Sequence, residues 1–151
     1  MKLFDAERNS FVSYINVQAI PENSKIMSDR FDLSRINYQT QRMKIIGEII
    51  ELYEAQRDYS VHKDQISYEK LCLEFADVCI SICTLLMLQD RKFVFIETSG
   101  FFEPEVWIRK ILQRETDFVL SDVFTFANRS SLNIEGYIKK KLKYNKNRKD
   151  W

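Results

Sequence analysis

The first half of the chain has the apolar spacing of two α-helices. Apolar side chains recur every three or four residues over 3–19 and again from about 34 to 58, as one face of a helix requires. The polar stretch 22–34 between them follows Pro21 and is expected to form an irregular loop. The apolar face of the second helix is expected to consist of Ile36, Met43, Ile46, Ile50 and Tyr53.

A third helix is expected from about Tyr68 to Gln89, with Ser67 as its N-cap. The polar residues within its long apolar stretch are Glu74, Asp77, Ser81 and Thr84. Their spacing places them on a single narrow stripe of an otherwise apolar helix, which is typical of a helix buried on most sides. A membrane span is disfavoured, because each of the two acids would cost about 2.5–3.5 kcal/mol at a bilayer centre.

The second half of the chain continues this pattern. The segment 91–103 contains a short apolar run that fits either a strand or a continued helix. Pro104 has the position of a first helical residue, and helical spacing continues from it to about Asn128. Asn133 is a candidate N-cap for a last helix over 134–147.

Composition agrees with an all-α fold. Three glycines and two prolines in 151 residues are too few for the turns of a many-stranded sheet protein, so we expect one all-α domain over 1–151, a bundle of about five helices. The 23 basic and 22 acidic side chains argue against a surface devoted to nucleic acid or membrane. Cys72, Cys79 and Cys83 fit neither a disulfide framework nor a zinc site, and the N-terminal segment has no signal-peptide pattern. The expected location is the cytoplasm.

Two pairs of acids are the candidate chemistry. Glu48 and Glu51 lie three residues apart on the second predicted helix, and Glu74 and Asp77 lie three apart on the third. Each pair shares a helix face, so four carboxylates converge if the two faces pack together. Like charges share a dry site only with cations, and carboxylate ligation suits hard divalent ions, Mg²⁺ in particular.

Two simpler interpretations remain open for these acids. Glu48 and Glu51 alone would be ordinary as solvated surface acids, since such pairs are common on helices. Glu74 and Asp77 have apolar neighbours and need a partner when buried, which the basic tail 139–149 would also supply.

The order of these motifs resembles the MazG-like all-α NTP pyrophosphohydrolase superfamily, which includes dimeric dUTPase and dCTPase branches. E-x-x-E is followed, after about two dozen residues, by E-x-x-D, and the tail contains the pattern K-x-x-x-N-x-x-R. The resemblance covers about 36–88 and 124–148 and implies a four-helix core. It implies these roles: Glu48, Glu51, Glu74 and Asp77 as Mg²⁺ ligands, Lys44 as a basic residue near substrate, and Lys141, Asn145 and Arg148 as triphosphate ligands.

The resemblance also implies a reaction. Members cleave nucleoside triphosphates between the α- and β-phosphates with Mg²⁺, which Mn²⁺ can replace, and release a nucleoside monophosphate and pyrophosphate. Their role is house-cleaning or control of the nucleotide pool, and they work as homodimers or homotetramers. Glu48 is the expected general base, assisted by Lys44, and no nucleic-acid or membrane partner is expected.

Two departures leave alternatives open. Gly47 stands where many members have another acid, and the segment 89–123 is longer than in minimal members, which resembles the dimeric dUTPase branch. The alternatives are a pyrimidine-specific dUTPase- or dCTPase-type nucleotidase and a non-catalytic helical interaction protein. Candidates for base recognition are Phe11, Tyr14 and Trp107 by stacking and Asn16 and Gln18 by hydrogen bonding, although core or surface roles are favoured for each of them.

Overall fold

The all-α fold is confirmed. The computed structural model describes residues 3–150, and this part of the chain contains helices and no strand. The α-helices are α1 (Leu3–Tyr14), α2 (Ile20–Arg30), α3 (Tyr38–His62), α4 (Gln65–Leu88), α5 (Pro104–Leu112), α6 (Thr116–Arg129) and α7 (Ile134–Asn147). The described chain has more helices than expected, because α2 lies where a loop was expected and the fourth predicted helix is divided into α5 and α6.

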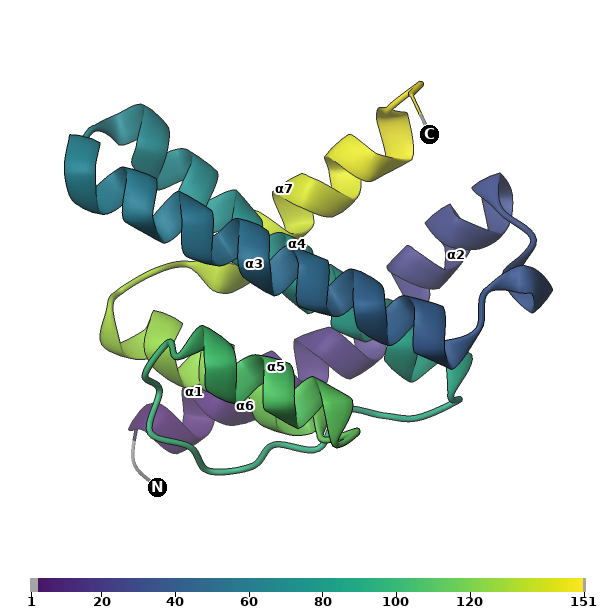
Figure 1. Cartoon of the computed structure of the whole chain (residues 1–151). Helices are drawn as coiled ribbons and strands as arrows, with labels where there is room; N and C mark the ends of the chain where they lie inside the picture. The colour runs from purple at the N-terminus through teal and green to yellow at the C-terminus, as the bar shows by residue number, and fades with distance from the viewer. Residues whose placement is uncertain (1–2, 151) are drawn as a thin grey trace.

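The long antiparallel pair α3 and α4 forms the centre of the molecule (Figure 1). Helix α4 packs against α2, α3, α6 and α7, so it is covered on most sides, as its apolar surface predicts. Helix α4 is long enough to span a membrane, and an 18-residue window within it has a mean hydropathy of 2.1. However, 72% of that window is buried inside the fold. The hydropathy of α4 is therefore explained by its place in the core.

Helix α3 presents a different face to the core from the one expected. Its buried residues are Gln41, Ile45, Ile49, Leu52 and Ala55. Met43, Ile50 and Tyr53, three members of the expected face, are 57%, 46% and 42% exposed. Apolar residues occur in adjacent pairs along α3, so two faces about 100° apart were available, and α4 packs on the face one residue away from the expected one.

The expected loop over 22–34 is wrong for most of its length, since α2 continues to Arg30. Residues 15–19 form a π-helical turn in which the Ile20 N–H donates to the Ile15 carbonyl. In a regular α-helix the Pro21 ring would clash with the carbonyl four residues earlier, and the wider π turn makes room for it. The helix continues past Pro21 and carries Asn23 into the interior.

The segment 91–103 has no regular structure and is fastened by side chains. The amide of Asn16 donates to the Phe93 carbonyl at 3.0 Å and accepts from the Phe93 N–H at 2.7 Å. Asp122 is 2% exposed and accepts from the Gly100 N–H at 2.8 Å and from Trp107 Nε1 at 2.7 Å. This segment therefore follows the surface of α6 without forming either element that its sequence suggested.

We expect Asp122→Ala to destabilise the fold by about 2–3 kcal/mol, because it leaves two buried donors without their acceptor. Chemical denaturation followed by circular dichroism measures this loss. The exposed Glu54 on α3 supplies the control, since Glu54→Gln should stay within about 0.5 kcal/mol of the parent. Equal midpoints for the two variants would contradict the fastening role of Asp122.

Candidate functional site

The predicted acids and bases meet around one cavity of about 130 Å³. All candidate site residues but Glu74 line it: Lys44, Glu48 and Glu51 from α3, Asp77 from α4, Lys141 and Asn145 from α7, and Arg148 directly after α7. Residues that were not predicted also line it: Asn23 and Met27 from α2, and Ile80, Ser81 and Thr84 from α4. The cavity lies where α2 and α7 flank the α3–α4 pair (Figure 1).

The packing of α3 on α4 brings the two acid pairs together. One oxygen each from Glu48, Glu74 and Asp77 can be chosen so that all three lie within 4.8 Å of one another. Glu51 lies one turn after Glu48 and lines the same cavity without belonging to this triad. The expected convergence of carboxylates is thus present in the described chain, with three acids in close contact and the fourth beside them.

Burial and mutual repulsion disfavour ionisation of these acids. Burial is the largest cause that raises the pKa of Glu48 from 4.5 to about 7, followed by the charges of Asp77, Glu51 and Glu74. Burial and the charges of Asp77 and Glu51 likewise raise the pKa of Glu74 to about 7. Burial also raises the pKa of Asp77, although the Lys141 ammonium opposes the shift. The basic side chains of the site therefore do not fully offset the negative charge of these acids.

The oxygens of the triad are also short of hydrogen-bond donors. Glu48 Oε2 and Glu74 Oε2 are buried and have no hydrogen-bond partner among residues 3–150. Buried polar atoms in folded proteins almost always have a partner, so an orphaned carboxylate oxygen indicates a missing ligand. An all-oxygen set of half-buried carboxylates fits a hard divalent cation such as Mg²⁺ or Mn²⁺.

Helix α7 contributes the positive side of the cavity. Lys141 Nζ lies 3.4 Å from Asp77 Oδ1. Asp77 therefore pairs with the basic tail, as one of the simpler interpretations of the acids expected. The Lys44 ammonium opposes the shift at Glu48 and the Lys141 ammonium opposes it at Glu74, yet the pKa values of both acids stay raised. Arg148 Nε contacts Asp150 at 2.9 Å while its side chain lines the cavity.

Gly47 leaves room for the acid that many members of the resembled superfamily carry there. A Cβ added at Gly47 would meet nothing within 4 Å. The glycine is therefore not required by close packing.

The candidate base-recognition residues, Gln18 included, lie outside this cavity. Phe11, Tyr14 and Trp107 are buried in the core, and the Asn16 amide is bound to the backbone of Phe93. None of them lines the cavity described above. Asn23 was missed because the chain was expected to leave the helix at Pro21; the helical spacing of Asn23, Ile26 and Met27 would have revealed it.

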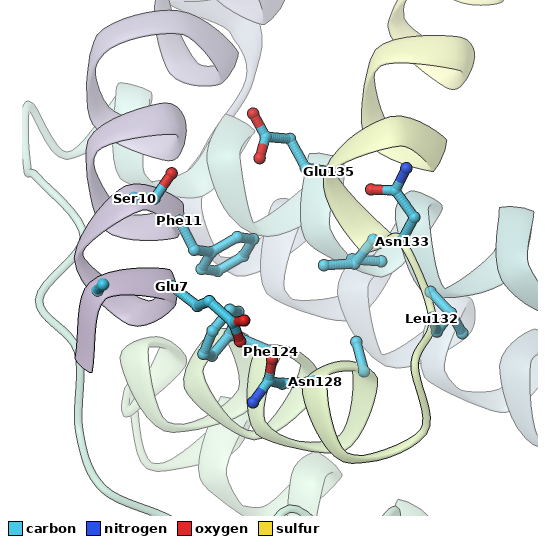
Figure 2. A pocket seen from close by; sticks show the side chains of 11 residues that line it. Glu7, Ser10, Phe11, Phe124, Asn128, Leu132, Asn133 and Glu135 are labelled. Carbon is cyan, nitrogen blue, oxygen red and sulfur yellow. The ribbon is translucent and has the colours of Figure 1, made fainter. Parts of the chain in front are cut away.

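A second cavity of about 350 Å³ lies between α1, α6 and α7 (Figure 2). Its charged lining residues are Glu7 and Glu135, and its floor includes Phe11 stacked on Phe124 with ring centroids 4.9 Å apart. With two acids and no lysine or arginine in its lining, this cavity would repel a polyphosphate. The smaller cavity beside the acid triad is the better candidate for phosphate chemistry.

No family model, curated protein or solved structure matches this chain. A functional assignment must therefore rest on the two sequence motifs and on the geometry of the cavity that they share.

Proposed function

We propose that this protein is a divalent-cation-dependent nucleoside triphosphate pyrophosphohydrolase that cleaves between the α- and β-phosphates. One observation carries the proposal. Acids of E-x-x-E and E-x-x-D meet in the fold, and the lysine, asparagine and arginine of the tail pattern line the cavity that Glu48, Glu51 and Asp77 also line. The residues of the tail pattern lie more than fifty residues after α4, so their meeting with the acids of α3 and α4 is not a consequence of local spacing.

The chemistry of the two sides suits a metal-bound triphosphate. Glu48, Glu51, Glu74 and Asp77 would hold Mg²⁺, which would offset phosphate charge and lower the barrier to attack by water. Glu48 would accept the proton of the attacking water as general base, with Lys44 next to it at the cavity edge. The water oxygen bonds to the α-phosphorus, the bond to the α–β bridging oxygen breaks, and pyrophosphate leaves.

The side chains of α7 would bind the leaving group. The Lys141 ammonium and the Arg148 guanidinium are donors of charge-assisted hydrogen bonds and would offset the charge on the β- and γ-phosphates. Asn145 is buried with its Oδ1 unpartnered, and its amide group lies in the same wall. One small cavity thus combines acids for the cation with basic side chains for the phosphates.

A panel of ribo- and deoxyribonucleoside triphosphates with Mg²⁺ or Mn²⁺ tests the proposal. The expected products are pyrophosphate and the monophosphate in equal amounts. A sharp preference for dUTP or dCTP would identify a pyrimidine-specific enzyme of the dUTPase or dCTPase type. Release of inorganic phosphate with a diphosphate, or no turnover at all, would refute the proposal, and absence of turnover would favour a helical interaction protein.

We expect Lys141→Gln to lower kcat/KM roughly tenfold to a hundredfold, because a charge-assisted contact to phosphate is lost. Lys140 is a matched control one residue away, since its side chain is 61% exposed and its ammonium lies near Glu69. Lys140→Gln should change kcat/KM less than about twofold. Equal losses in the two variants, measured by pyrophosphate release, would show a general charge effect and contradict the assigned contact.

A further inference from the structure

Asn23 occupies the part of the cavity farthest along α4 from the acids. Its side chain is buried, with 1% of its surface exposed, and it lines the cavity. Asn23 Nδ2 donates to Thr84 Oγ1 at 2.8 Å, and Thr84 Oγ1 donates to the Ile80 carbonyl at 3.2 Å. This chain of donors fixes the orientation of the amide and leaves Asn23 Oδ1 buried without a partner.

The position of Asn23 separates it from the cation and phosphate end of the site. Thr84 follows Asp77 by two helical turns, which corresponds to about 10 Å along the axis of α4. Asp77 and Thr84 belong to the polar stripe of α4, and both line the cavity. A nucleotide whose phosphates are bound by Lys141 and by a cation at the acids can place its nucleoside half at the Asn23 end of the cavity.

The missing partner of Asn23 must be a hydrogen-bond donor. An amide oxygen only accepts, and ionised phosphate oxygens also only accept, so the two do not bind each other. The nucleoside half of a nucleotide carries suitable donors in its sugar hydroxyls and in the N–H groups of its base. A buried acceptor of this kind penalises a ligand that lacks the donor, because the acceptor is then left desolvated and unpaired.

We propose that Asn23 Oδ1 is a specificity determinant that accepts a hydrogen bond from a sugar hydroxyl or a base N–H of the substrate. Thr84 is a positioning residue, since it holds the amide in the orientation that presents Oδ1. The inference rests on the proposed function for the identity of the substrate, and it adds the chemical group that the enzyme selects.

The test compares the parent with Asn23→Leu on substrates that differ by one donor. One arm removes the 2′- or 3′-hydroxyl, and the other replaces a base N–H by N-methyl. We expect the parent to discriminate against one such analogue roughly tenfold to a hundredfold in kcat/KM. Asn23→Leu should lower kcat/KM for the donor-bearing substrate to the value for that analogue and leave the analogue unchanged. The arm in which the parent discriminates and Asn23→Leu does not shows whether the donor is a sugar hydroxyl or a base N–H.

Two further variants separate selection from damage to the fold. Thr84→Val keeps Asn23 but removes its anchor, so it should reduce the same discrimination. Ser28 lies exposed on α2, and Ser28→Ala should retain both discrimination and thermal midpoint. A parent that shows no donor preference, or an equal loss on every substrate in both Asn23→Leu and Thr84→Val, would overturn the inference.

Binding measurements with Ca²⁺ distinguish failure of this inference from failure of the proposed function. Calorimetry with the same nucleotides reports donor selection without turnover. Donor-selective binding that depends on Asn23, in a protein that cleaves nothing, would refute the hydrolase proposal and support the selection. Turnover without donor selection would support the hydrolase proposal and refute the role of Asn23. A protein that binds none of the nucleotides would refute both.

Discussion

Glu74→Gln and Asp77→Asn are each expected to lower kcat/KM for nucleotide cleavage by about 10²–10³-fold. Each change removes the charge of a half-buried acid from the site where three carboxylates converge, and each retains the size of the side chain. Losing one fixed charge that acts at the reacting centre typically costs this much. Pyrophosphate release at saturating Mg²⁺ and at several nucleotide concentrations measures the effect and separates kcat from KM.

The same experiment contains its own control. Glu54 lies one turn after Glu51 on α3, is exposed and does not line the cavity. Glu54→Gln should retain the parent rate within about twofold, because a solvated surface charge is largely screened. Intact cleavage in both Glu74→Gln and Asp77→Asn would show that the acids of α4 are structural and that the reaction, if any, occurs elsewhere.

The acid site could be predicted from the sequence because its geometry depends on local periodicity. Residues three apart on a helix share a face whatever the tertiary fold, so each acid pair was fixed once its helix was recognised. That the pairs meet depended on the packing of α3 on α4. The apolar surface of α4 predicts a central position for this helix, and α4 follows α3 in the sequence with only Lys63 and Asp64 between them.

The remaining features depend on competition between alternatives that the sequence does not resolve. Pro21 usually ends a helix, but the π turn before it allows the chain to continue, and this brings Asn23 into the cavity. Helix α3 has two apolar stripes, and its packing against α4 determines which of them is buried. The course of 91–103 depends on long-range hydrogen bonds to Asn16 and Asp122, for which no local pattern exists.

The near-zero net charge conceals the most informative property of the chain. Balanced totals of basic and acidic side chains suggest a surface without a charged partner. In the fold, acids of α3 and α4 face Lys141 and Arg148 across one small cavity. A scarcity of glycine also excludes a glycine-rich phosphate loop, so side chains and a cation are left to bind a polyphosphate.

Stability that falls with rising pH and recovers with Mg²⁺ is the second large effect that we expect. The pKa values of Glu48 and Glu74 are about 7 in the folded protein and near 4.5 in the unfolded chain. Between these values the folded state binds more protons, so the free energy of unfolding decreases as pH rises from 4.5 through 7. Each raised pKa corresponds to roughly 3 kcal/mol, and the two acids share part of this cost because they repel each other.

Thermal melting of the metal-free protein should therefore give a midpoint about 5–10 °C lower at pH 8 than at pH 5.5, relative to the double variant Glu48→Gln/Glu74→Gln measured in parallel. The double variant lacks both titrating groups, so the difference between the two proteins isolates their contribution from all other ionisations.

Added Mg²⁺ should raise the midpoint of the parent strongly at pH 8 and weakly at pH 5.5, because protons compete with the cation for the same oxygens. If the parent and the double variant show the same pH dependence and the same response to Mg²⁺, the acids of the triad neither destabilise the fold by mutual repulsion nor bind the cation. A pH-dependent difference without any Mg²⁺ response would instead describe a strained cluster of acids in a protein that lacks the proposed chemistry.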